Sequence, residues 1–340
     1  MIIVFGAAGF IGTYLIDQLI KEDYSVVAAD ISESGLSYYE KLGIPYCCVD
    51  ITDKTNFNKL PTEGIEAVIN LACVQPANVS EDKYNPADYI KVNVIGTLNI
   101  LDFCLNNNIN EFIYTCSHRN TQGLWKEKEG IAIKEADGRA IKYTGDYAMF
   151  SISESAAMDC VEHYSQAYGL QGIVFRLPPV YGYGPHTEIY KDGKPLTTGF
   201  QIFINNAMQG KPLEVWGDCN KGRDIIYVKD VVSAFILALK KKNASGLYNI
   251  SSGRLSSLKE EAECIAREFW PQGSQPQLLY SPDKPNGIES YFYDISRAKI
   301  DLGWVPKYPF SEMIVDYKKE LEAERFHYLV EKRKRMMDGE

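Results

Sequence analysis

The first half of the chain alternates between short apolar runs and segments whose apolar residues recur at helical spacing. Residues 2–5 are almost uniformly apolar, residues 13–21 have a helical period, and residues 25–29 form a second apolar run. Short apolar runs bounded by turn-forming residues are typical of buried strands, and amphipathic segments between them are typical of helices. The pattern predicts strands at residues 2–5, 25–29, 45–49, 67–71 and 112–115, and helices around 13–21, 34–42, 51–66, 94–105 and 150–168.

Strands that alternate with helices predict a parallel, doubly wound α/β sheet with right-handed crossovers. In such sheets, ligands bind at the carboxyl ends of the strands. In this sequence the residues at those ends are Gly6, Asp30, Asp50, Ala72 and Ser117. We therefore expect the ligand site along this edge.

The turn after the first predicted strand reads GAAGFIG. Gly6 permits a tight turn that a side chain would block. Gly9 lets the backbone approach a pyrophosphate, and Gly12 lets the helix pack on the strand. The helix N-terminus presents free N–H groups to phosphates, and Asp30 can accept hydrogen bonds from both ribose hydroxyls of an adenosine. Strand, turn, helix and acid in this order predict a dinucleotide-binding site.

The net charge of −9 gives the chain no general attraction to nucleic acid or to anionic membranes. No apolar run reaches membrane-spanning length, and the first core strand starts at the N-terminus, so no signal peptide is expected. The basic stretch KRKRMMDGE is interpreted as a solvated helix end. The sequence predicts a cytoplasmic protein with no nucleic acid or membrane partner.

The eight cysteines are scattered and include no CxxC pair. Cys73, Cys104 and Cys116 lie in apolar runs and are expected to be buried small hydrophobes. We therefore expect a reducing compartment without disulfides. The four histidines lack metal-ligand spacing, so no metal site is expected.

Further motifs follow in a fixed order. They are NLAC at 70–73, NPADYIKVNVIGTLNIL at 85–101, RLPPVYGYGP at 176–185, GRDIIYVKDVV at 222–232, YNISSG at 248–253 and DISRAKIDLGWVP at 294–306. Together with GAAGFIG, they resemble the NAD-dependent epimerase/dehydratase family of extended short-chain dehydrogenases/reductases, which acts on nucleotide sugars. The resemblance extends from residue 1 to about residue 320.

This resemblance implies a Rossmann-type doubly wound parallel sheet with a smaller, interleaved C-terminal substrate lobe. The NAD-binding domain is expected at 1–177 plus about 223–250. The substrate lobe is expected at 178–222 plus about 251–320, and a C-terminal helix at 321–340.

The resemblance also implies NAD as cofactor and a nucleoside diphosphate sugar as ligand. Asp30 would repel a 2′-phosphate, and the next two residues offer no cation, so we expect NAD to bind more tightly than NADP. The expected cofactor-binding residues are Gly6, Gly9, Phe10, Ile11, Gly12, Asp30, Asp50, Ile51, Leu71, Ala72, Asn93 and Glu154.

Three residues are expected to bind the nucleotide sugar. Arg223 is assigned to the diphosphate, because a guanidinium fork suits paired phosphate oxygens. By resemblance, Phe203 helps to enclose the nucleotide base and Ser117 lies beside the sugar. Pro179 replaces an Asn of the family pattern, so one sugar or phosphate contact is expected to differ.

The chain departs from the family where its chemistry is carried out. The resemblance implies a Tyr-x-x-x-Lys pair on a long helix, in which the Tyr phenolate takes a proton from a sugar hydroxyl. The Lys holds the nicotinamide ribose and lowers the Tyr pKa from about 10. A gap-free match of residues 150–168 places Phe150 on the Tyr and Glu154 on the Lys. Phe cannot act as a base, and a carboxylate would raise the pKa of a nearby Tyr.

Several residues could replace the missing base. Tyr143 and Tyr147 lie just upstream, and Tyr147 is one helical turn before the altered position, so it could share that helix face. The alternatives are His118, Glu154 and Glu135. The candidate catalytic residues are Ser117, Tyr147, His118 and Glu154.

Two functions remain open at this point. One is an NAD-dependent epimerase or dehydratase of a nucleotide sugar with an atypical base. The other is a catalytically inactive NAD- and nucleotide-sugar-binding protein with a regulatory or scaffolding role. Binding motifs this complete usually accompany chemistry, which favours the enzyme. The Lys- and Glu-rich insertion at 125–143 is a candidate lid.

The helix at 150–168 has an apolar stripe formed by Ile152, Ala156, Cys160 and Tyr164. The helix that ends near residue 105 is apolar over much of its surface. In the family that the chain resembles, these two helices pair with their twofold mates in a four-helix bundle. We therefore expect a homodimer.

Overall fold

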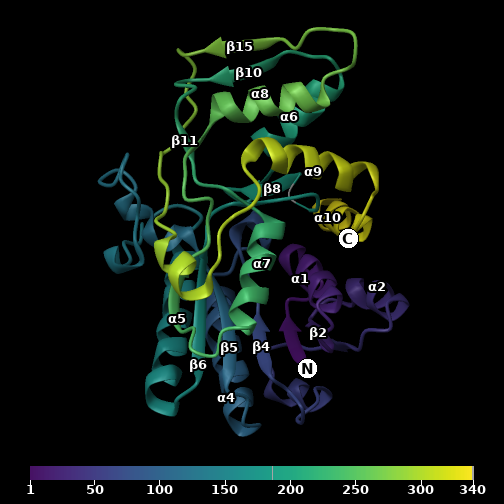
Figure 1. Ribbon diagram of the computed structural model, residues 1–340, viewed down its shortest axis with the longest axis vertical. Coiled ribbons are helices and arrows are strands. Elements are labelled where there is room, and N and C mark those ends of the chain that lie inside the picture. Colours follow the sequence, from purple (N-terminus) through teal and green to yellow (C-terminus); the bar gives the residue numbers. More distant parts are fainter. Residues whose placement is uncertain (186, 339–340) are drawn as a thin grey trace.

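The computed structural model describes residues 1–185 and 187–338, and its centre is a parallel sheet (Figure 1). Within these residues the sheet has seven strands in the order β13-β6-β5-β4-β1-β2-β3. Their bounds are β1 Ile2–Phe5, β2 Val26–Asp30, β3 Tyr46–Cys48, β4 Ala67–Asn70, β5 Glu111–Ser117, β6 Gln171–Leu177 and β13 Gly246–Asn249. The predicted doubly wound α/β fold is confirmed.

Alternate residues of the strands pack into two separate hydrophobic cores, one on each face of the sheet. On one face, Ile2 and Val4 of β1 pack with α1 (Phe10–Lys21) and α7 (Val228–Leu239). On the other face, Ile3 and Phe5 pack with α4 (Thr97–Asn106) and α5 (Ala148–Tyr168). Because both faces are covered, the strands are apolar throughout, as a buried parallel sheet requires. The short helix α2 (Leu36–Lys41) connects β2 to β3.

Two connections differ from the predicted helices. The segment expected to be helical at 51–66 forms only a 3₁₀ turn, Lys54–Lys59, capped by the Asp53 side chain. Leu60 is extended because Pro61 follows it, which stops the helix after six residues. Before α4, the chain forms α3 (Pro86–Tyr89) and a wide π turn at Ile90–Gly96.

The chain leaves the sheet after β6 and builds the smaller lobe at the top of Figure 1. β7 (Val180–Tyr181) pairs with β12 (Ile226–Tyr227), which leads back into α7 and β13. The lobe contains β8 Glu188–Lys191, β9 Lys194–Thr197, α6 Gly199–Met208, β10 Leu213–Trp216, β11 Gly222–Arg223, β14 Ser256–Ser257, α8 Leu258–Phe269 and β15 Leu278–Ser281. The chain thus crosses between the two parts more than once, and the exact domain boundaries stay a prediction.

The C-terminal part contains α9 (Phe310–Glu322) and α10 (His327–Asp338), which lie between the upper lobe and α1 in Figure 1. The interpretation of the basic stretch as a solvated helix end is wrong for two of its residues. Arg333 is 5% exposed, and Lys332 donates a hydrogen bond to the backbone of the glycine turn. Their burial follows from the packing of α10 against both parts of the molecule, which the local charge pattern does not reveal. The last two residues lie outside the described part.

All eight cysteines are free thiols. Cys104 and Cys116 are buried, as expected, but Cys73 is exposed. The expectation for Cys73 is wrong because it lies beyond the end of β4, in the wall of a cavity. In the part of the chain that the structure describes, no helix is long and apolar enough to cross a membrane.

Candidate active site

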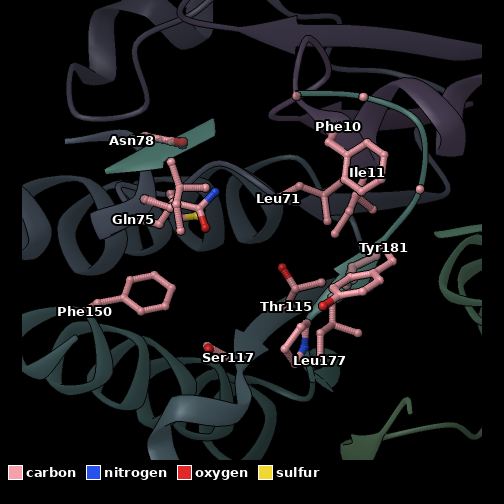
Figure 2. A pocket seen from close by; sticks show the side chains of 18 of the residues that line it. Phe10, Ile11, Leu71, Gln75, Asn78, Thr115, Ser117, Phe150, Leu177 and Tyr181 are labelled. Carbon is pink, nitrogen blue, oxygen red and sulfur yellow. The ribbon is translucent and has the colours of Figure 1, made fainter. Parts of the chain in front are cut away.

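A cavity of about 1020 Å³ runs along the carboxyl ends of the strands and into the smaller lobe (Figure 2). It extends from the glycine turn to Arg223. In Figure 2, Phe150 and Tyr181 reach into the pocket from opposite sides. The expected site residues that line the cavity are Gly6, Gly9, Phe10, Ile11, Gly12, Asp30, Asp50, Ile51, Leu71, Ala72, Ser117, His118, Tyr147, Glu154, Phe203 and Arg223.

The glycine turn leaves room for a dinucleotide. Gly6 has φ +77°, and a Cβ on Gly12 would lie 2.3 Å from the Gly6 carbonyl oxygen, so neither position tolerates a side chain. Helix α1 starts at Phe10, and Gly9 before it makes no side-chain cap hydrogen bond, which suits a helix N-terminus that binds a phosphate. This cradle and the uncapped helix fit the diphosphate of NAD.

Two carboxylates at strand ends flank the same half of the cavity. Asp30 accepts hydrogen bonds from the backbone N–H groups of Ala8 (3.0 Å) and Ser32 (2.9 Å). Asp50 accepts from the backbone and side chain of Thr52, at 2.9 and 2.8 Å. Both side chains are therefore oriented by the backbone before any ligand binds.

Asn93 is buried, and among the described residues it is not in the cavity wall. Its amide oxygen accepts from the N–H of Val74 (2.8 Å), and its nitrogen donates to the Val74 carbonyl (3.1 Å) and to Ser153 Oγ (2.9 Å). These bonds occupy the amide and hold the loop after β4, and the assignment of Asn93 as a cofactor contact stays a prediction.

Phe150 and Glu154 both line the cavity from α5, one helical turn apart. Glu154 is 3% exposed, and its Oε1 accepts a hydrogen bond from the Tyr114 hydroxyl at 3.1 Å. Burial raises the pKa of Glu154 to about 8. The hydrogen bonds from the Tyr114 hydroxyl and the Ser117 N–H lower this pKa, but by less than burial raises it. The position of the family Lys is therefore occupied by a largely uncharged carboxyl group at neutral pH, rather than by a carboxylate.

Glu154→Gln should become more stable, relative to the native protein, as the pH rises from 5 to 8. The folded-state pKa of Glu154 lies above its ordinary value near 4.5, so the native protein loses stability across this window as the unfolded chain ionises first. The relative gain is at most about 1.4 kcal/mol per pH unit. Urea unfolding at several pH values measures it, with the exposed Glu162→Gln as control. A pH-independent difference would contradict the assignment.

Tyr147 stands immediately before α5 and lines the cavity, with its ring centroid 6.3 Å from that of Phe150. The Arg119 guanidinium carbon lies 4.1 Å from the centroid of the Tyr147 ring. Arg119 is also a cavity residue, and its Nε is buried without a hydrogen-bond partner among the described residues. Tyr143, in contrast, is 74% exposed, which leaves Tyr147 as the better placed of the two tyrosines.

His118 is buried, with Nδ1 3.2 Å from the Leu177 carbonyl oxygen, and its ring stacks against Trp125 and Tyr291. Burial and the positive charges of Arg119 and Arg223 hold the pKa of His118 well below its usual range. A weak base of this kind is a poor proton acceptor at neutral pH.

Glu135 is separate from the site, since it is not among the described residues that line the cavity. Its carboxylate instead accepts a hydrogen bond from the backbone N–H of Asn249 at 2.8 Å. The insertion around it does not behave as a free lid. Trp125 and Ile133 form a small core with Tyr291 and Tyr293, and residue 133 pairs with residue 293 in a short parallel bridge. The insertion is thus packed onto the smaller lobe.

Arg223 enters the far end of the cavity from β11. Its Nη2 donates to the Tyr181 hydroxyl at 3.2 Å. Burial raises the pKa of the neighbouring Glu261 to about 7, and the positive charge of Arg223 acts against this shift. A fixed guanidinium in a cavity that Phe203 also lines is suited to a phosphate group and a flat base.

Comparison with known proteins fits this architecture. A model of the NAD dependent epimerase/dehydratase family matches residues 2–251. The chain belongs to this family. It is 29% identical to a Methanocaldococcus jannaschii protein named provisionally as a UDP-glucose 4-epimerase, over 92% of this chain and 96% of that one. It is 27% identical to UDP-glucuronic acid decarboxylase 6 of Arabidopsis thaliana, over 92% of this chain and 85% of the relative.

The crystal structure of UDP-glucose 4-epimerase with UDP-glucose from Thermotoga maritima superposes with a TM-score of 0.73 at 25% identity. The match covers 94% of this chain and 99% of that one. The family resemblance read from the motifs is therefore confirmed, and NAD is the cofactor of the family. The predicted replacement of the Tyr-x-x-x-Lys pair by Phe150 and Glu154 stays a prediction within this family.

The cavity wall also contains polar residues that the sequence analysis did not assign to the site, among them Arg119, Tyr181, Glu261 and Lys332. Tyr181 lies within the motif RLPPVYGYGP, but the motif alone gave it no role. Arg119 follows Ser117 by two residues, which was the one available signal, because residues just beyond a strand end commonly face the ligand.

Proposed function

We propose that this member of the NAD-dependent epimerase/dehydratase family is an enzyme that acts on a nucleoside diphosphate sugar by transient hydride transfer. The observation that carries the proposal is one continuous cavity that both the dinucleotide cradle and Arg223 line. Ser117 and Tyr147 lie in the same wall.

The cavity residues divide between the two ligands. In this proposal the glycine turn and α1 hold the diphosphate of NAD, and Asp30 takes the adenosine ribose. Glu154 lies where the nicotinamide ribose would be held, and its carboxyl group can exchange hydrogen bonds with ribose hydroxyls. Arg223 takes the diphosphate of the sugar nucleotide. When bound, the nicotinamide supplies the hydride acceptor.

Tyr147 is the proposed base, in place of the residue that Phe150 replaces. Its hydroxyl would take the proton of a sugar hydroxyl, with the Ser117 hydroxyl sharing that hydrogen bond. Arg119 is the cation beside the Tyr147 ring. It would stabilise negative charge developing on the phenol oxygen, as the family Lys does. His118 is the second candidate, disfavoured by the low pKa that burial imposes on it.

The test is turnover by the purified protein of a panel of UDP-hexoses and UDP-uronic acids supplied with NAD, followed by product analysis. Conversion of any member supports the proposal and identifies the reaction. Binding of NAD and of a UDP-sugar without conversion of any member would support the inactive alternative.

We also propose a homodimer built on α5. Ile152, Ala156 and Cys160 are each only half-buried in the single chain, and Ile95 on the neighbouring turn is 43% exposed. This apolar stripe is suited to a twofold mate. Ala156→Arg should therefore give a monomer at micromolar concentration, measured by light scattering. Glu162→Arg, at an exposed position of the same helix, should remain a dimer. A monomeric native protein would contradict the proposal.

A further inference from the structure

Helix α10 returns from the end of the chain to the cofactor half of the cavity. Arg333, which is 5% exposed, anchors it there. Its guanidinium donates to Glu188 O (2.8 Å), Asn78 Oδ1 (2.9 Å) and Ala77 O (2.7 Å). These bonds tie α10 both to β8 in the smaller lobe and to the loop after β4.

The adjacent Lys332 faces the glycine turn. Its Nζ donates to the Ala8 carbonyl oxygen at 3.1 Å, and the residue lines the cavity. The N–H of Ala8 donates to Asp30 Oδ2 at 3.0 Å. A cation from α10 and the carboxylate at the end of β2 therefore bind opposite sides of the same residue.

Among the described residues, one hydrogen bond of the Lys332 ammonium is recorded, the bond to Ala8. The ammonium carries three N–H groups, of which the Ala8 bond uses one. Burial lowers the pKa of Lys332, and the negative charge of Asp30 acts against this shift. The remaining donors border the part of the cavity where Asp30 would meet an adenosine ribose.

The chemistry at this ribose decides between the two nicotinamide dinucleotides. A carboxylate accepts from the 2′-hydroxyl of NAD, whereas a nearby cation accommodates the 2′-phosphate of NADP. Asp30 alone would exclude NADP, and the two residues after it offer no cation. We infer that Lys332 is a specificity-determining residue that contacts the 2′ position and offsets the repulsion of a 2′-phosphate by Asp30. The inference rests on the proposed placement of the adenosine ribose at Asp30.

The test measures dissociation constants of NAD and NADP by calorimetry for the native protein, Lys332→Met and the matched control Lys334→Met. Lys334 is exposed on the same helix. Losing a charge-assisted phosphate contact should weaken NADP binding by about tenfold or more, and NAD binding much less. The dissociation constant of NADP divided by that of NAD should therefore rise in Lys332→Met. It should stay at the native value in Lys334→Met and close to the native value in Lys332→Arg.

The outcomes separate this inference from the cofactor assignment. An unchanged ratio in Lys332→Met, with tight NAD binding retained, would overturn the role of Lys332 alone. Equal weakening of NAD binding and NADP binding would also overturn it, since Lys332 would then only stabilise the packing of α10. If the native protein bound neither dinucleotide, the proposed cofactor site would fail together with the inference. Should Lys332→Met fold poorly, Lys332→Gln removes the same charge and keeps a polar end.

Discussion

Tyr147→Phe should lower kcat for the converted UDP-sugar by about a hundredfold to ten-thousandfold, which is the range that a positioned general base contributes. The substitution removes only the hydroxyl. The ring remains in place beside Arg119 and Phe150, so binding of NAD and of the sugar nucleotide should change little. Steady-state kinetics and calorimetry separate the two effects.

Tyr143→Phe is the matched control, because Tyr143 is four residues upstream and 74% exposed. If Tyr143→Phe kept the native kcat while Tyr147→Phe lost most of it, Tyr147 would be identified as the base. If Tyr147→Phe turned over at the native rate and His118→Ala did not, the proton acceptor would be His118.

A rescue experiment tests the same assignment independently. Phe150→Tyr combined with Glu154→Lys restores the family pair on the same cavity wall. Introduced into Tyr147→Phe, this pair should return part of the lost kcat. If the variant folded and bound NAD but recovered no kcat, the side chains at positions 150 and 154 would not face the sugar carbon that is oxidised.

Arg223→Ala should weaken the binding of a UDP-sugar by roughly tenfold to a hundredfold, since one charge-assisted phosphate contact contributes about 1.5–3 kcal/mol. NAD affinity should stay nearly unchanged, because Arg223 comes from β11 of the smaller lobe, whereas the glycine turn follows β1 of the sheet. Calorimetry with UDP alone and with the UDP-sugar shows whether the loss lies in the diphosphate contact.

Arg254→Ala provides the control. Arg254 belongs to the same lobe, but it pairs with Glu260 at 2.8 Å, and it is not among the described residues that line the cavity. Equal weakening of NAD and UDP-sugar binding in Arg223→Ala would mean that Arg223 supports the lobe structurally. Unchanged binding of both ligands would remove it from the site.

Much of the site was predictable because it is local in the sequence. Gly6 and Gly12 are required by a tight turn and a close helix-strand contact, and these depend on residues within one supersecondary unit. Asp30 follows from the position of the second strand end, since parallel strands bring their carboxyl ends to one edge. The replacement of the catalytic pair at Phe150 and Glu154 was equally visible, because helical spacing fixes both positions relative to the rest of α5.

What the sequence could not decide depends on contacts between distant segments. The protonation of Glu154 is set by its burial beside Tyr114, which lies 40 residues earlier on β5. The hydrogen bonds of the Asn93 amide depend on Val74, in the loop after β4, which lies 19 residues earlier in the sequence. No local pattern encodes either environment.

The sequence by itself determined the parallel α/β fold, the dinucleotide turn and the family, and it predicted the replacement of the usual base. The reason is that these depend on periodicity and on spacing within short segments. Only the tertiary structure decided which groups surround the altered helix. It placed Arg119 over Tyr147, and it carried Lys332 from the end of the chain to Ala8. Such pairings arise from the packing of whole elements, because burial and distance are properties of the folded molecule rather than of any stretch of the sequence.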